Sequence, residues 1–147
     1  MTEPPGRAED DSFISGDEIL YRRLSYDGGT WVLRDPVSGE RSRPQSGGFD
    51  HDTDGVSVFR QAVLLELDPP LGPEAVGDVV VGFSAADVRS LRLGVRADPW
   101  PQDVPDKGHP RYAAHALVTG LDQLGRRERK RRQQDLVKVP SMKFVHG

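Results

Sequence analysis

Short apolar runs separated by turn-forming residues recur along most of the chain. Runs of this length, alternating with polar positions or continuous, are typical of β-strands. They predict strands at residues 19–24, 30–33, 56–60, 78–83 and 91–97. Asp27, Gly28 and Gly29 supply the backbone freedom of a tight turn, so we expect residues 30–33 to return beside residues 19–24.

Two further segments carry helix signals. Ser84 is a favourable N-cap and Asp87 stands at the third helical position, which predicts a short helix through about Ser90. A final helix is expected over about residues 124–137, and Pro140 ends it.

Two apolar segments remain open between strand and helix, residues 62–67 and residues 112–118. Several strands with few helices between them fit an α+β fold better than an alternating, doubly wound one. The sequence therefore predicts one small mixed, mostly antiparallel sheet with two or three short helices.

The chain length of 147 residues fits one domain. Residues 1–16 are rich in Pro, Gly and acidic residues and have no apolar period, which predicts a disordered acidic tail. Residues 17–147 form the single α+β domain, including the basic C-terminal helix. The long polar loops 39–55 and 98–110 are expected to form a contact surface.

Composition excludes several kinds of chemistry. The chain has no Cys, which excludes disulfides, thiolate nucleophiles and Cys-ligated metal sites. It contains no nucleophile-elbow, P-loop, zinc-protease or dinucleotide-binding motif, so no cofactor and no catalytic residue is predicted. The N-terminus lacks an apolar signal region and no run of eighteen apolar residues occurs, which favours a cytoplasmic protein without a membrane partner.

The most basic segment lies near the C-terminus. Between residues 125 and 135 no position is apolar, so a helix there offers the core no face to pack. Its cations suit an acidic protein surface or the phosphates of RNA, although no aromatic residue is interleaved for base stacking. The alternative is a solvated helix, or one that touches the acidic tail. The basic residues are Arg126, Arg127, Arg129, Lys130, Arg131 and Arg132.

An acidic motif precedes the strand at residues 56–60. Asp50, Asp52 and Asp54 are followed by a glycine, as in the first half of a calcium-binding EF-hand loop. The twelfth position, where that loop needs a bidentate Glu, is Gln61. An acidic turn is therefore favoured, and no metal site is predicted.

Two arginines are expected to point toward the core. If residues 19–24 form a strand, Arg22 shares a face with Leu20 and Leu24, and Arg60 shares one with Val58 in the same way. A buried guanidinium must find a carboxylate, a carbonyl or a bound anion. The two readings are structural ion pairs and a pocket for a phosphate or carboxylate ligand.

His115 is the most informative of the four histidines. It stands six residues after His109, a spacing that does not favour shared metal binding on a helix. We expect a hydrogen-bonded structural histidine beside the loop at residues 98–101.

Several short pieces occur in a characteristic order from about residue 19 to 118. They are Tyr21-Arg22-Arg23, Ser46-x-x-Phe49, Ser57-Val58-Phe59-Arg60, Asp98-Pro99-x-Pro101 and Ala114-His115-Ala116. Their order resembles a family of small, uncharacterised bacterial proteins. The resemblance implies a common fold and no known activity.

A second likeness concerns ADP-ribosyltransferase-like domains. Leu20-Tyr21-Arg22 resembles the arginine-bearing strand that opens those domains, and Ser57 stands where they carry a serine on a later strand. The resemblance implies that Arg22 holds a dinucleotide phosphate while Ser57 lines the pocket. The catalytic acid of those domains has no match in this chain.

The sequence favours a non-catalytic binding module that contacts an acidic protein or RNA through its basic C-terminal helix. The alternative is an ADP-ribosyltransferase-like enzyme that uses Arg22 and Ser57. The candidate ligand-binding residues are Arg22, Ser57, Arg60 and His115. The oligomeric state is left open.

Overall fold

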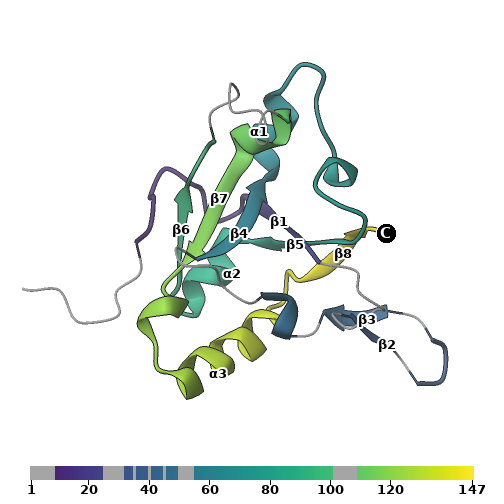
Figure 1. Ribbon diagram of the computed structural model, residues 1–147, viewed down its shortest axis with the longest axis vertical. Helices are drawn as coiled ribbons and strands as arrows, with labels where there is room; N and C mark the ends of the chain where they lie inside the picture. The colour runs from purple at the N-terminus through teal and green to yellow at the C-terminus, as the bar shows by residue number, and fades with distance from the viewer. Residues whose placement is uncertain are drawn as a thin grey trace, which may run out of the picture.

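A computed structural model describes residues 9–24, 32–34, 36–39, 41–44, 46–49, 55–100 and 109–147. Six strands form the main sheet: β1 (Ile19–Arg23), β4 (Val56–Arg60), β5 (Val80–Ser84), β6 (Gly94–Ala97), β7 (His115–Thr119) and β8 (Lys143–His146). Their order is β6-β7-β4-β1-β5-β8, and each pair of neighbours is antiparallel. Two more strands, β2 (Val32–Arg34) and β3 (Arg41–Pro44), pair with each other in a separate small sheet (Figure 1).

The helices are short. The α-helices are α1 (Gln61–Glu66), α2 (Ala85–Ser90) and α3 (Arg126–Leu136). Single 3₁₀ turns are η1 (Ser46–Phe49), η2 (Pro73–Ala75), η4 (Pro110–Ala114) and η5 (Leu121–Gln123). The predicted α+β fold with a mostly antiparallel sheet and few helices is confirmed.

Apolar clusters lie on both faces of the main sheet. One cluster includes Val88 of α2, Leu136 of α3 and Phe49 of η1, and the other includes Leu64 of α1 and Ala114 of η4. Cover on both faces explains why β5 and β7 are buried at nearly every position instead of alternating between buried and exposed.

The alternation of side chains along β1 places two neighbouring arginines on opposite faces. Leu20 joins the cluster packed by α2 and α3, whereas Tyr21 joins the cluster packed by α1. With a period of two, Arg22 follows Leu20 toward α3, and Arg23 follows Tyr21 toward α1.

Most predicted elements occur where the sequence placed them, and the open segments are resolved. Residues 62–66 fall in α1 and Leu67 is its C-cap, and residues 112–118 divide between η4 and β7. Strand β2, which overlaps the strand predicted at residues 30–33, differs from the prediction because it pairs with β3 instead of β1. Both edges of β1 are taken by the apolar strands β4 and β5.

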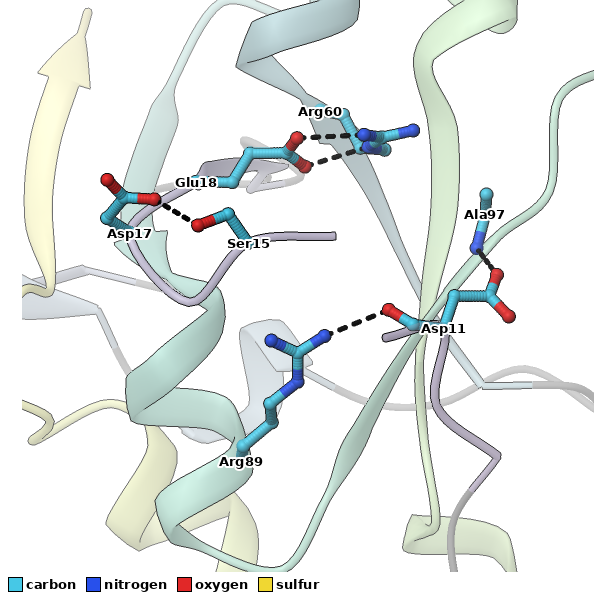
Figure 2. A network of polar contacts seen from close by, with 7 residues as sticks. All are labelled: Asp11, Ser15, Asp17, Glu18, Arg60, Arg89 and Ala97. Carbon is cyan, nitrogen blue, oxygen red and sulfur yellow. Dashed lines mark hydrogen bonds and ion pairs between the residues drawn. The ribbon is translucent and has the colours of Figure 1, made fainter. Parts of the chain in front are cut away.

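The N-terminal segment also differs from the prediction of a disordered tail through residue 16. Ile14 is fully buried in the core. The Asp11 amide donates to the Val95 carbonyl (2.8 Å), and the Ala97 amide donates to Asp11 Oδ2 (2.8 Å), so the segment covers the outer edge of β6 (Figure 2). Aspartates that hydrogen-bond to strand amides are structural, although their composition is that of a tail.

No helix in the described ranges is both long enough and apolar enough to cross a membrane.

Candidate ligand-binding site

The two central strands β1 and β4 pair over only two residues. Leu20 pairs with Arg60 and Tyr21 pairs with Phe59. At the next positions the Arg22 guanidinium donates to the Ser57 carbonyl (Nη1 to O, 2.9 Å) and to the Gly48 carbonyl (Nε to O, 3.0 Å). A side chain thus takes the place of the strand ladder, and the sheet opens between the C-terminal end of β1 and the start of β4.

Ser57 and His115 meet on the α1 face of the sheet beside this opening. His115 of β7 lies opposite Phe59, and Leu117 lies opposite Ser57, so the serine and the histidine are diagonal neighbours on adjacent strands. The Ser57 Oγ and His115 Nε2 atoms are hydrogen-bonded. The predicted hydrogen-bonded histidine is confirmed.

The other imidazole nitrogen contacts Asp98. His115 Nδ1 lies 3.0 Å from the Asp98 carbonyl oxygen and 3.0 Å from Asp98 Oδ2. Both atoms are acceptors when the carboxylate is ionised, so Nδ1 carries the hydrogen. In the neutral ring Nε2 is then the acceptor, and the Ser57 hydroxyl donates to it.

Aromatic rings hold the imidazole in place. The Trp100 ring lies 4.3 Å from the His115 ring and the Phe59 ring lies 5.6 Å from it, measured between centroids. His115 is only 2% exposed. Trp100 Nε1 donates to Asp98 Oδ2 (3.1 Å), and the Asp98 amide donates to the His115 carbonyl (2.9 Å). The Ser57–His115–Asp98 chain is therefore held by ring contacts on the imidazole and by hydrogen bonds at Asp98.

A cavity of about 290 Å³ adjoins this chain. Its lining includes Ser57, the aromatic residues Phe59, Trp100 and Tyr112, and three arginines, Arg22, Arg23 and Arg111. Arg22 is bonded to carbonyls, as described above. The cavity therefore brings one serine hydroxyl, an aromatic wall and two further guanidinium groups together.

Arg23 and Arg111 reach the cavity from different sides. The Arg23 side chain packs directly on Gly77. A Cβ at position 77 would lie 2.3 Å from Arg23 Cγ, so a residue with a side chain there would displace Arg23. Arg111 lies with its guanidinium carbon 4.8 Å from the centre of the Tyr112 ring, and its Nη2 donates to the Tyr112 hydroxyl (3.2 Å). Within the described part of the chain neither arginine forms an ion pair.

The neighbourhood of Arg111 disfavours further positive charge. His109 accepts a hydrogen bond from the Arg111 amide at Nδ1 (3.1 Å). Burial lowers the pKa of His109, and the charge of Arg111 lowers it further. Protonation of His109 is therefore disfavoured beside the Arg111 guanidinium.

Three of the four predicted ligand-binding residues meet at this site, and the fourth does not. Arg22, Ser57 and His115 converge at the opening of the sheet. Arg60 lies elsewhere, because its guanidinium makes a bidentate pair with Glu18 (2.7 and 2.8 Å). Its buried position was predicted, and its partner is a carboxylate of the chain.

The sequence reasoning missed Arg23, Asp98 and Arg111 as site residues. Arg23 was present in the Tyr21-Arg22-Arg23 piece, but strand alternation was applied only to its neighbour. Asp98 belonged to the loop expected beside His115, yet its carboxylate was not paired with the imidazole. Arg111 carried no signal, because its place depends on η4 lying over α1 and β4.

The basic helix α3 is held more firmly than its composition suggests. Gln133 is buried and donates to the Phe49 carbonyl (3.1 Å), and Leu136 is fully buried. Arg132 donates to the Leu91 carbonyl, so this cation is structural. Of the predicted interaction residues, Arg126, Arg127, Lys130 and Arg131 are exposed and Arg129 is half-buried.

Two predicted features lie outside the described residues. These are the Asp50, Asp52 and Asp54 motif, and most of the predicted contact loop at residues 98–110. Comparisons with protein-family models, curated proteins and solved structures found no match. The resemblance to small bacterial proteins therefore stays a prediction.

Proposed function

We propose that the protein binds a small molecule carrying a phosphate or carboxylate group in the cavity beside Ser57. One observation carries this proposal: Arg23 and Arg111 line the same cavity and neither is paired with a carboxylate in the described residues. Guanidinium groups bind carboxylates and phosphates with two parallel hydrogen bonds. The Ser57 hydroxyl and the aromatic wall supply further polar and apolar contacts.

The size of the cavity limits the ligand. A volume of about 290 Å³ lies at the lower end for small-molecule sites. It suits a single anionic group with a small organic part. The stacked rings of Trp100 and Tyr112, 4.6 Å apart, offer that part a flat apolar surface.

Thermal unfolding in the presence of anions tests the proposal. Phosphate and succinate are compared with sodium chloride at equal ionic strength. A ligand at about 100 times its dissociation constant stabilises by about 2.7 kcal/mol, or roughly 10 °C for a domain of this size. We expect stabilisation by at least one of the two anions beyond that of chloride.

Charge-matched variants locate the effect. Arg23→Gln combined with Arg111→Gln removes the stabilisation, whereas Arg126→Gln combined with Arg127→Gln, at exposed positions of α3, keeps it. Equal loss in both variants, or stabilisation equal to that of chloride, would show that the cavity is not an anion site.

The ADP-ribosyltransferase-like alternative has weaker support. Arg22 and Ser57 do border one cavity, as the alternative requires. The Arg22 guanidinium, however, is engaged by two carbonyls, and the cavity is small for a dinucleotide. Stabilisation by NAD that Arg22→Ala abolishes would favour this enzyme over the anion-binding protein.

The basic helix supports a second candidate function, contact with RNA or an acidic protein. Arg126 and Arg127 occupy the first turn of α3, where the helix dipole disfavours cations. Within the described residues, the ion pair of the helix joins Glu128 and Arg131 and is long at 4.0 Å. A bound polyanion would relieve both effects.

Binding to a short RNA at several salt concentrations tests this second function. Charge reversal to Glu at Arg127, Lys130 and Arg131 should abolish salt-sensitive binding, whereas Lys143→Glu, outside the helix, should weaken it little. Undiminished affinity after the triple reversal would eliminate the RNA version.

A further inference from the structure

We infer that Ser57 is a nucleophile that hydrolyses small esters bearing a negatively charged group. The inference rests on the proposed function for its substrate class, because the anion-binding arginines select the charged group. It adds a reaction at the serine, which simple binding does not require.

The geometry supplies what an activated serine needs. Ser57 lines the cavity, and its hydroxyl hydrogen points to His115 Nε2, because Nδ1 already donates to Asp98. A base within hydrogen-bond reach of the hydroxyl, oriented by a third group, is the arrangement that activates serine. A strand interior is an unusual place for it, but Ser57 lies beside the opening between β1 and β4 and lines the cavity.

The reaction is written in two halves. Ser57 Oγ attacks the ester carbonyl carbon while its proton passes to His115 Nε2; the carbon–oxygen bond to the alcohol then breaks, and the alcohol leaves with that proton. Water next gives a proton to His115 and attacks the acyl-serine, and the proton returns to Ser57 Oγ as the acid departs. The balance is ester and water to acid and alcohol, with no oxidant or metal.

The arginines give the reaction its selectivity. A carboxylate or phosphate on the substrate pairs with Arg23 or Arg111, which positions the ester beside Ser57. A second guanidinium near the carbonyl stabilises the negative charge that develops on its oxygen. Neutral esters lack the first interaction and are expected to react more slowly.

Asp98, Trp100 and Arg22 are positioning residues. Asp98 fixes the imidazole tautomer, and Trp100 holds the Asp98 carboxylate through its indole nitrogen. Arg22 holds the backbone of Ser57 at the opening of the sheet.

Covalent labelling with a fluorophosphonate tests the nucleophile. Ser57 Oγ forms a bond to phosphorus, the phosphorus–fluorine bond breaks, and fluoride leaves while the proton goes to His115. Mass spectrometry of the intact protein and of its peptides is expected to show one label, at Ser57. Ser57→Ala should abolish it, whereas Ser90→Ala, which changes an exposed serine without a histidine partner, should keep it.

Positioning by Asp98 has a separate readout. Asp98→Asn should slow labelling by at least about 100-fold without changing the labelled residue, because the imidazole loses its preferred tautomer. Asp98→Glu should restore part of the rate. A purely structural role would instead lower the melting temperature in step with the rate.

Substrate selectivity is measured with p-nitrophenyl esters. The monoester of succinate should exceed the acetate ester in kcat/KM by about 10-fold or more, and Arg23→Gln should remove that advantage. Labelling elsewhere or nowhere in the folded protein would overturn the nucleophile while leaving anion binding intact. Labelling of Ser57 without any anion stabilisation would sustain the nucleophile and overturn the proposed function.

Discussion

Arginines serve two different purposes in two regions of the molecule, along the N-terminal segment and in the cavity. Along the N-terminal segment, Arg60 pairs with Glu18, Arg89 with Asp10 and Arg96 with Glu9 (Figure 2 shows the first of these pairs). In the cavity, Arg23 and Arg111 have no such partner among the described residues. Arginine thus stabilises the fold through ion pairs in one region, and in the other region its positive charge is available to a ligand.

The contrast explains why a charged residue in a core pattern is an ambiguous signal. Hydrogen bonding to Glu18 raises the pKa of Arg60, against the lowering effect of its burial. The Arg60 guanidinium therefore already has its ion partner, and we assign it a role in stability and not in ligand binding. A cation in a cavity without a carboxylate adds little to stability, and its charge is available to a ligand.

The largest expected effect is at the Glu18–Arg60 pair. Its side chains are 9% and 15% exposed, so Glu18→Gln leaves a nearly buried guanidinium without its charge partner. We expect a loss of about 3 kcal/mol in the free energy of unfolding, measured with urea at pH 7.

A double variant separates the charge from the packing. Glu18→Leu with Arg60→Met removes both charges and should recover most of that loss. A loss below about 1 kcal/mol for Glu18→Gln alone would show that the pair is only a surface contact.

Asp11 comes next. Its carboxylate accepts from the Ala97 amide on the edge of β6, and Asp11→Ala leaves that amide without its acceptor. We expect a loss of about 1–2 kcal/mol in urea unfolding and faster hydrogen exchange at Ala97. If residues 9–16 were a disordered tail, the variant would be as stable as the parent protein.

The cavity arginines should behave in the opposite way. Arg23→Gln and Arg111→Gln, measured without added anions, should each change the free energy of unfolding by no more than about 0.5 kcal/mol. Among the described residues neither substitution breaks an ion pair, and each removes one positive charge from the cavity. A loss comparable to that of Glu18→Gln would place these residues with the structural arginines.

The smallest effect concerns pH. The pKa of His109 is lowered in the folded protein, so below about pH 6.5 the unfolded chain binds more protons and stability falls as pH falls. Since His109 is exposed, solvent screening limits the loss to a few tenths of a kcal/mol. His109→Asn keeps an acceptor for the Arg111 amide. The free energy of unfolding of this variant, measured with urea, should change less between pH 7 and 5.5 than that of the parent protein.

Local signals were enough to predict much of the fold. The apolar run of β5 and the Ser84 cap, whose hydroxyl accepts from the Asp87 amide, depend on residues close in the chain. Because burying an unpartnered guanidinium is costly, the sequence predicted that Arg22 and Arg60 would have partners. Both do, a carbonyl for Arg22 and a carboxylate for Arg60. The identity of the partners did not follow, because each joins residues more than twenty positions apart.

The predictions for the N-terminal segment and for helix α3 differ from the structure for the same reason. The N-terminal acids had the composition of a tail, but their acceptor oxygens match the free amides of an edge strand. Helix α3 had no apolar stripe, but a buried glutamine and one leucine anchor it. Polar anchoring of this kind has no periodicity, so patterns of apolar residues do not reveal it.

The most direct test of the central claim is a phosphate titration followed by two-dimensional ¹H–¹⁵N NMR at constant ionic strength. We predict saturable shifts at Arg23, Ser57 and Arg111. Signals should stay unchanged at Asp11, whose carboxylate accepts from the Ala97 amide, and at Arg89, which already pairs with Asp10. Shifts confined to the first turn of α3, or weak shifts spread over all exposed cations, would contradict the account.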